Sequence, residues 1–148
     1  MYAIRKCQPG HETDEALAIF RRALPDLSCA GDKDSTFFLA RIGGKAVAAI
    51  CLKVSEGRAE VSPVAFVEGP ATDGIGMALR RRARDEAIVR GFKQLLLPDG
   101  KTESLPAAHV YMCKVCGREN RYVPRPGARL KCAGCGYLTL SDELTDRL

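Results

Sequence analysis

Four cysteines in the C-terminal part of the chain have the most specific spacing in the sequence. Cys113 and Cys116 form one Cys-x-x-Cys pair, Cys132 and Cys135 form another, and fifteen residues separate the two pairs. Each pair places two thiolates on one tight turn, so two such turns facing each other predict tetrahedral sulfur ligation of a metal ion. Four protein ligands leave no open coordination position. We therefore expect a structural metal and not a catalytic one.

This cysteine segment, residues 108–140, resembles a zinc ribbon. Zn²⁺ is the metal that we expect, and iron in a rubredoxin-like site is the alternative because its ligand set and geometry are similar. Metal binding contributes roughly 10–16 kcal/mol in zinc-finger peptides and would stabilise a segment that has few apolar side chains. Residues 141–148 are expected to form a tail.

The cysteine segment also carries most of the excess positive charge. The chain has a formal net charge of +5, and residues 111–136 contain six basic side chains and one acidic side chain. Tyr122 and Tyr137 lie among the basic residues. This composition could bind nucleic acid through phosphate contacts and base stacking, or contact a protein partner. An ordinary solvated surface on a small metal-stabilised module is the alternative.

A second chemical pattern is the glycine turn Gly74-Ile75-Gly76, which joins the strand-like segment AEVSPVAFV and the loop EGPATD to a long helical run. The first N–H groups of a helix lack partners within the helix and lie at the positive end of its dipole. The turn therefore predicts an anion site that suits phosphate. A side chain at Gly74 or Gly76 would hold a pyrophosphate away from these donors.

This strand, turn and helix, with Arg90-Gly91-Phe92 and the apolar run 95–97 after them, resembles the coenzyme A-binding core of the GNAT superfamily of N-acetyltransferases. In that family the loop reads Arg/Gln-x-x-Gly-x-Gly/Ala, and its amides hold the pyrophosphate of acetyl-CoA. Here Ala71 takes the first position, and Asp73 lies where the family often has Lys or Arg. The resemblance covers residues 1 to about 97. It implies an α/β GNAT-like acyltransferase fold with a mixed, mainly antiparallel central sheet in residues 1–105.

The resemblance also implies a set of residues that would bind acetyl-CoA. Backbone donors of the strand and the glycine turn would hold the cofactor, together with one arginine of the helix. These residues are Phe66, Val67, Thr72, Asp73, Gly74, Ile75, Gly76, Met77 and Arg80.

Four arginines lie on the helix, at positions 80, 81, 82 and 84. Two of them have an acidic residue four positions later, which predicts the solvated pairs Arg81–Asp85 and Arg82–Glu86. Arg80 and Arg84 lack such partners. They are therefore the arginines that we expect to reach the phosphates.

Glu60 is the candidate general base. It lies eleven residues before Ala71, which is the spacing of the general-base glutamate in some GNAT enzymes. A carboxylate in a partly desolvated cleft has a raised pKa and could accept a proton from an incoming ammonium group. A surface glutamate on a strand face is the alternative.

Tyr111 is the candidate general acid. The spacing Ser104-x-x-Ala107-x-x-x-Tyr111 resembles an Asn-x-x-Ala-x-x-x-Tyr pattern of the family, in which the tyrosine protonates the leaving thiolate. Pro106 is compatible with the first turn of a short helix that starts near Ser104. An aromatic packing residue beside a Cys-x-x-Cys turn is the alternative.

The N-terminal elements must position this site. Residues 2–7 predict a first strand, and Thr13 predicts the N-cap of a helix that ends at Pro25. Residues 26–34 read as a polar loop or a short irregular helix, and the resemblance implies that this region shapes the acceptor site. Residues 35–42 and 45–54 alternate as two strands around Gly43-Gly44 and predict a hairpin.

A turn at Glu56-Gly57 leads into the next strand, which begins at Arg58. The period of two places Glu60, Ser62, Val64 and Phe66 on one face of it. Pro63 cannot donate a hydrogen bond, which predicts a bulge or a separation from the neighbouring strand. Free main-chain groups beside such a gap could bind the pantetheine arm of the cofactor.

These observations predict an N-acetyltransferase that moves the acetyl group of acetyl-CoA to a primary amine, with the acceptor left open. The alternative is a catalytically weak GNAT-like scaffold whose basic ribbon binds nucleic acid or a protein. The N-terminus lacks an apolar signal segment, and no run approaches the ~20 apolar residues that span a bilayer, so we expect a cytoplasmic protein with reduced thiols. A sheet edge left by the shortened C-terminal end of the fold could pair with a second subunit in a homodimer.

Overall fold

The computed structural model describes residues 2–25, 35–55, 57–67 and 73–145. Its first half contains β1 (Tyr2–Lys6), α1 (His11–Ala23), β2 (Ser35–Ile42), β3 (Lys45–Ser55), β4 (Arg58–Val61), β5 (Ala65–Phe66) and α2 (Asp73–Val89). Its second half contains β6 (Gln94–Leu96), β7 (Thr102–Ser104), β8 (His109–Met112), β9 (Glu119–Tyr122), β10 (Arg129–Lys131), β11 (Leu138–Leu140) and α3 (Ser141–Thr145). None of the described helices is both long and apolar enough to cross a membrane.

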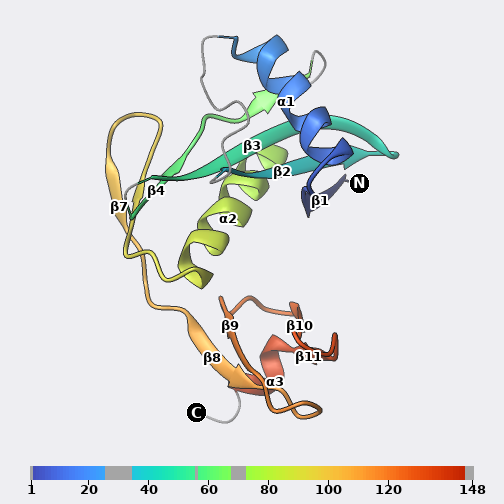
Figure 1. Ribbon diagram of the computed structural model, residues 1–148, viewed down its shortest axis with the longest axis vertical. Coiled ribbons are helices and arrows are strands. Elements are labelled where there is room, and N and C mark those ends of the chain that lie inside the picture. The colour runs from blue at the N-terminus through green and yellow to red at the C-terminus, as the bar shows by residue number, and fades with distance from the viewer. Residues whose placement is uncertain (1, 26–34, 56, 68–72, 146–148) are drawn as a thin grey trace.

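A seven-stranded mixed sheet forms the N-terminal domain, in the order β1-β2-β3-β4-β6-β7, and β5 pairs separately with β3. All of these pairs are antiparallel except β4 with β6. Figure 1 shows α1 on one face of the sheet and α2 on the other. The predicted α/β fold with a mainly antiparallel sheet is confirmed.

The predicted hairpin between β2 and β3 is confirmed. Gly43 and Gly44 join the two strands with φ angles of 57° and 82°, which side chains other than glycine rarely tolerate. The register changes between Ala40 and Arg41, where Val47 is the extra residue of a bulge in β3. β2 and β3 lie inside the sheet, and their alternating side chains contribute to both of its faces.

Two apolar clusters hold α1 and α2 against the sheet. On the α2 face, the cluster contains Phe38, Ile50 and Leu52 of the sheet and Leu79 of the helix. On the α1 face, Phe20 packs against Phe37 with ring centroids 5.8 Å apart. Both clusters use the alternation of β2 and β3, so neighbouring residues of one strand serve opposite helices.

The start of α1 differs from the prediction. The helix begins at His11 with Gly10 at the N-cap position, so Thr13 lies inside the first turn and is not the cap. The hydroxyl of Thr13 donates to the carbonyl oxygen of Gln8 at 3.0 Å. β1 ends at Lys6, and the turn at Pro9 and Gly10 leads directly into the helix. The N-cap position is therefore three residues earlier than predicted.

The strand after Gly57 is interrupted. Ala59 and Val61 of β4 face α2. Phe66 of β5 also faces α2, although it lies five residues after Val61 and strict alternation would turn it to the opposite face. Consequently Glu60 and Phe66 lie on opposite faces, and the prediction that they share one face is wrong. The predicted bulge at Pro63 explains the change, because one extra residue reverses the alternation.

The predicted short helix near Ser104 is absent. Residues 102–104 form β7, the edge strand of the sheet beside β6, and residues 105–108 have no regular structure. The chain then continues into two separate hairpins, β8-β9 and β10-β11, which form the ribbon. Pro106 therefore lies in the connection between sheet and ribbon, where no N–H donor is needed.

The residues expected to be a tail pack on the ribbon. Ser141 at the start of α3 is 1% exposed, and its N–H donates to the carbonyl oxygen of Ala128 at 2.9 Å. Asp142 accepts from the N–H of Gly127 at 3.1 Å. At least residues 141 and 142 are therefore anchored to the ribbon.

Candidate functional site

The first candidate site lies where α2 begins. The helix starts at Asp73, and Gly74 is exposed, with none of the described residues within 4 Å of the position of a Cβ atom. A Cβ at Gly76 would lie 3.4 Å from the Phe66 ring, so the helix start packs closely on β5. Ile75 is buried beneath it and Met77 is 60% exposed. Thr72 and Ala71 lie outside the described residues.

The edge of β5 adjoins this helix start. The N–H of Val67 donates to the carbonyl oxygen of Val47 at 2.9 Å, so Val67 is not a free donor as predicted. Alternation along an antiparallel strand places the N–H of Phe66 on the opposite edge. In the described part of the chain no strand pairs with that edge, since β5 pairs with β3 alone. The gap predicted from Pro63 is therefore open beside α2.

The arginines of α2 contact other partners than predicted. Asp85 accepts from Arg125 of the ribbon at 2.6 and 3.2 Å, and Glu86 accepts from Lys6 at 2.7 Å. The predicted pairs Arg81–Asp85 and Arg82–Glu86 are thus wrong, because Arg125 takes the Asp85 carboxylate, and Lys6 and Arg90 share that of Glu86. Arg82 instead lies over the Phe38 ring, 5.7 Å from its centroid.

Arg84 is also not available for phosphate. Its guanidinium forms an ion pair with Glu103 of β7, which ties the helix to the edge strand. Arg80 is exposed, and its guanidinium lies 3.9 Å from the position of a Cβ on Gly76. Of the two predicted arginines, only Arg80 lies beside the helix start.

Glu60 lies in β4 on the face turned away from α2. It is exposed and lines a small hollow of about 150 Å³ with Lys53, Ser62 and Pro63. The hollow adjoins the strand interruption, where the Ser62 hydroxyl accepts from the N–H of Cys51 at 2.9 Å. Glu60 is thus near the gap, but the partly desolvated cleft expected around its carboxylate is not formed by these residues.

Tyr111 lies in the ribbon, away from the start of α2. It is 6% exposed in β8, its ring packs on Tyr122 at 5.6 Å, and its buried hydroxyl has no hydrogen-bond partner among the described residues. Burial and then the neighbouring cysteines raise the pKa of its hydroxyl. The ribbon contacts α2 at Asp85, in the C-terminal half of the helix, and the seventeen-residue helix is about 25 Å long. The structure therefore favours the packing alternative over the predicted acid.

The four cysteines of the second candidate site come together as predicted. Their sulfur atoms all lie within 4.8 Å of one another, and the Sγ atoms of Cys113 and Cys135 are 3.5 Å apart, as are those of Cys116 and Cys132. Tetrahedral Zn²⁺ with Zn–S bonds near 2.3 Å requires sulfur separations of about 3.8 Å. The donor set and its spacing therefore fit one tetrahedral metal ion.

Backbone amides support the thiolates. The N–H of Val115 donates to Cys113 Sγ at 3.4 Å, and the N–H of Gly134 donates to Cys132 Sγ at 3.3 Å. The pKa of Cys132 falls to about 5, mainly because of a backbone hydrogen bond from Cys135 and then because of Asn120. A lowered pKa favours the thiolate, which is the form that binds metal.

Asn120 is a site residue that the sequence analysis missed. It is 8% exposed, its amide donates to Cys132 Sγ at 3.5 Å, and its carbonyl oxygen accepts from the N–H of Ala133 at 3.1 Å. It thereby links β9 to the second cysteine turn. The sequence signal for Asn120 was its position between the charged residues Glu119 and Arg121 on a short strand. Alternation turns its side chain to the buried face, where a polar group needs a hydrogen-bond partner.

The ribbon is attached to the C-terminal end of α2, as Figure 1 shows. Besides the bidentate contact of Arg125 with Asp85, the guanidinium of Arg121 lies 3.2 Å from the position of a Cβ on Gly91. Gly91 has a φ angle of 91° and ends the helix. Because Gly91 has no side chain, the Arg121 side chain of the ribbon can lie against the N-terminal domain at this point.

Comparisons with solved structures identify the fold of the N-terminal domain. The ribosomal-protein-S18-alanine N-acetyltransferase from Escherichia coli aligns with a TM-score of 0.50 at 20% identity, over 66% of this chain and 66% of that chain. A GNAT family acetyltransferase from Brucella melitensis in complex with acetyl-CoA aligns at 0.52 and 17%, over 66% and 75%. Eis1 from Mycobacterium abscessus aligns at 0.53 and 21%, over 64% and 27%.

The chain thus spans just under two thirds of the E. coli enzyme and about a quarter of Eis1. No protein-family model and no curated protein matches the sequence. The similarity establishes that the domain has the GNAT fold.

Proposed function

We propose that this chain is an acetyl-CoA-dependent N-acetyltransferase that uses a primary amine as acceptor. The observation that carries the proposal is the interrupted strand: β4 pairs with β6 while β5 pairs only with β3, next to the first turn of α2. The gap offers main-chain groups to a pantetheine arm, and the helix start offers N–H groups to a pyrophosphate. Both features occur at the same end of α2.

The residues have distinct roles in this proposal. The N–H groups of the first helical turn, from Asp73 to Ile75, hold the pyrophosphate, with Arg80 beside them, whereas the N–H of Met77 bonds within the helix. The N–H of Phe66 reaches the pantetheine arm or the thioester carbonyl, where a donor stabilises the oxyanion. The amine nitrogen then attacks the thioester carbonyl, the C–S bond breaks as the C–N bond forms, and coenzyme A leaves as a thiolate that takes its proton from solvent. Glu60, which lies near the strand interruption, accepts the proton that the attacking nitrogen loses.

Calorimetric titration of the metal-loaded chain with acetyl-CoA tests the cofactor claim. We expect saturable binding of acetyl-CoA and of free coenzyme A, and none of NAD. Gly74→Val should abolish this binding and leave the sheet and α2 folded, because no atom of the described part of the chain lies within 4 Å of the new Cβ. Ala18→Val, at an exposed position of α1, is the matched control. Wild-type binding retained in Gly74→Val would place the pyrophosphate elsewhere.

A second experiment tests Glu60. Glu60→Gln should lower acetyl transfer by roughly 10²- to 10⁴-fold at neutral pH while acetyl-CoA affinity is unchanged. Glu119→Gln, an exposed carboxylate of the ribbon, is the control and should transfer at the wild-type rate. Because the acceptor is open, the assay follows thiol release across a panel of primary amines. Equal rates in both variants would remove Glu60 from the mechanism.

We also propose that the four cysteines bind one structural Zn²⁺. Support comes from the sulfur spacing and from the amide donors to Cys113 and Cys132. Iron fits the same donor set. Elemental analysis of the purified chain distinguishes the two, with one zinc per chain as the expected result.

A further inference from the structure

Two hollows lie at the end of the N-terminal domain opposite the proposed cofactor site. The first has a volume of about 560 Å³ and is bordered by the start of β4, the Gly91–Lys93 turn and the open face of β6 and β7. The second, about 470 Å³, lies between that turn and the ribbon. They share Gly91, Phe92 and Lys93, so they meet around a single turn. Both volumes are in the range of small-ligand sites.

The charged side chains that line the two hollows are all cationic: Arg58, Arg90, Lys93 and Arg121. Arg90 is already engaged, since it donates to Glu86 at 3.1 Å and to the hydroxyl of Thr36 at 2.7 Å. Among the described residues, Arg58, Lys93 and Arg121 form no ion pair. Three cations without an ion-pair partner in the described part of the chain, around two hollows that share one turn, favour a ligand that carries negative charge.

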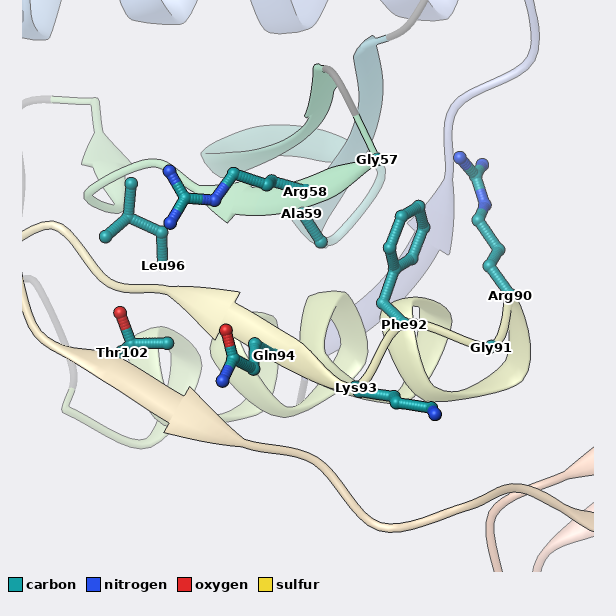
Figure 2. A pocket seen from close by; sticks show the side chains of 10 residues that line it. All are labelled: Gly57, Arg58, Ala59, Arg90, Gly91, Phe92, Lys93, Gln94, Leu96 and Thr102. Carbon is teal, nitrogen blue, oxygen red and sulfur yellow. The ribbon is translucent and has the colours of Figure 1, made fainter.

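The cations do not converge on one point. Figure 2 shows Arg58 extending along β4 toward Leu96, whereas Arg90 and Lys93 extend away from the turn in different directions. Arg121 reaches the turn from the ribbon side. Because the cations extend in different directions around the turn, the arrangement suits a ligand with spaced negative charges.

The walls between the cations are apolar or neutral. Phe92 projects into the first hollow toward Gly57 and Ala59, and Gln94 and Thr102 supply neutral hydrogen-bonding groups. The second hollow is lined by Leu105, Pro106 and Val110. Unstacked bases fit apolar recesses with neutral polar groups, and a phosphodiester backbone supplies spaced charges. An acidic peptide would bring carboxylates into these apolar recesses without equivalent planar groups.

We infer that a single-stranded nucleic acid binds along the two hollows, across the junction between the GNAT-fold domain and the ribbon, with its phosphates on Arg58, Lys93 and Arg121. This assigns the nucleic-acid contact to the junction and not to the ribbon alone. Two of the ribbon cations are already paired, Arg125 with Asp85 and Lys114 with Glu143 at 3.8 Å. The inference does not depend on acetyl-CoA binding.

Fluorescence anisotropy of labelled oligouridine, about 20 nucleotides long, tests the inference with the metal-loaded full chain. Three phosphate contacts predict a slope of log K against log salt of about −2, or about an 18-fold loss of affinity from 50 to 200 mM salt. Lys93→Gln with Arg121→Gln should reduce the slope to about −0.7 and the loss to about 2.6-fold. Arg5→Gln with Arg21→Gln removes two exposed cations elsewhere and should keep the wild-type slope.

A second double variant tests whether the lost affinity comes from disruption of the contact between the domain and the ribbon. Arg58→Gln with Lys93→Gln keeps Arg121 beside Gly91 and should weaken binding as much as the first double variant does. Unchanged affinity and slope in both double variants would overturn the inference. So would equal binding of an oligoglutamate of matched charge, which would indicate an acidic peptide, or equal binding of duplex RNA, which cannot place bases in the hollows.

Discussion

The two halves of this chain bury very different side chains. The N-terminal domain has two apolar clusters, one on each face of its sheet, built from residues such as Ile50, Leu79 and Phe20. The ribbon buries two tyrosines, two of the cysteines and the polar residues Asn120, Thr139 and Ser141. Apolar burial can stabilise the first, whereas the second would depend on hydrogen bonds and on the metal ion that we propose for the four cysteines. On this proposal, one chain combines two sources of stability that fail under different conditions.

Removing the metal ligands is the strongest way to separate the two halves. Cys113→Ser with Cys132→Ser eliminates the tetrahedral donor set, and structural Zn²⁺ supplies roughly 10–16 kcal/mol in comparable small modules. We expect loss of bound zinc and unfolding of residues 109–141, seen as lost amide-exchange protection, while the sheet around Ile50 stays protected. A metal-free double variant with a folded ribbon would show that coordination is not what holds this half together.

A core truncation should produce the opposite pattern. Leu79→Ala removes a fully buried side chain of the α2 face and should lower the free energy of unfolding of the N-terminal domain by about 2–5 kcal/mol. Zinc content should not change. Met77→Ala, on the same helix at 60% exposure, is the matched control and should cost little. Zinc loss in the Leu79 variant would mean that the halves fold as one cooperative unit.

The contact between Arg125 and Asp85 measures how strongly the halves are coupled. The bidentate pair is partly exposed, at 35% for the arginine side chain and 18% for the aspartate. A double-mutant cycle with Arg125→Gln and Asp85→Asn should give a coupling energy of about 1 kcal/mol. Denaturant unfolding provides the free energies. A coupling near zero would leave the covalent connection at 105–108 as the main link between the halves.

Acid should weaken the N-terminal domain slightly through Glu15. Arg41 donates to both oxygens of its carboxylate, at 2.8 and 3.1 Å, and this hydrogen bonding lowers the pKa of Glu15. A carboxylate with a lowered folded pKa contributes stability above its unfolded pKa of about 4.3 and loses it as the pH falls through the folded value. Between pH 5 and pH 2, the free energy of unfolding should fall by about 0.5–1 kcal/mol less in Glu15→Gln than in the wild type. Equal acid dependence in both chains would contradict this assignment.

Local sequence signals predicted the parts of the molecule that local interactions determine. Gly43-Gly44 between two apolar alternating segments defined the hairpin, and the two Cys-x-x-Cys pairs defined the sulfur cluster, because spacing along the chain sets both geometries. The break at Pro63 was predicted for the same reason, since a missing N–H is visible in the sequence. The order of elements led to the GNAT fold.

Tertiary contacts decided what the sequence could not. Asp85 and Glu86 have arginines four residues before them, but these are not their partners. Arg125, forty residues away, pairs with Asp85, and Lys6, eighty residues away, pairs with Glu86 beside the local partner Arg90. Tyr111 follows a family spacing, but the chain enters the ribbon at that point and places the ring on Tyr122. The assignments of Glu60 and the cofactor residues remain predictions that the proposed experiments test.

The interrupted strand between Val61 and Phe66 also determines where the chain can accept changes in length. Residues 62–64 are not in a strand, and the direction of the Phe66 side chain is set by the register of β5 with β3, in which Phe66 lies opposite Ala48. A residue inserted among positions 62–64 would therefore change the width of the gap, while Phe66 would still pack beside Gly76. An insertion within β4 or β5 would instead shift the paired residues by one and turn their side chains to the other face of the sheet.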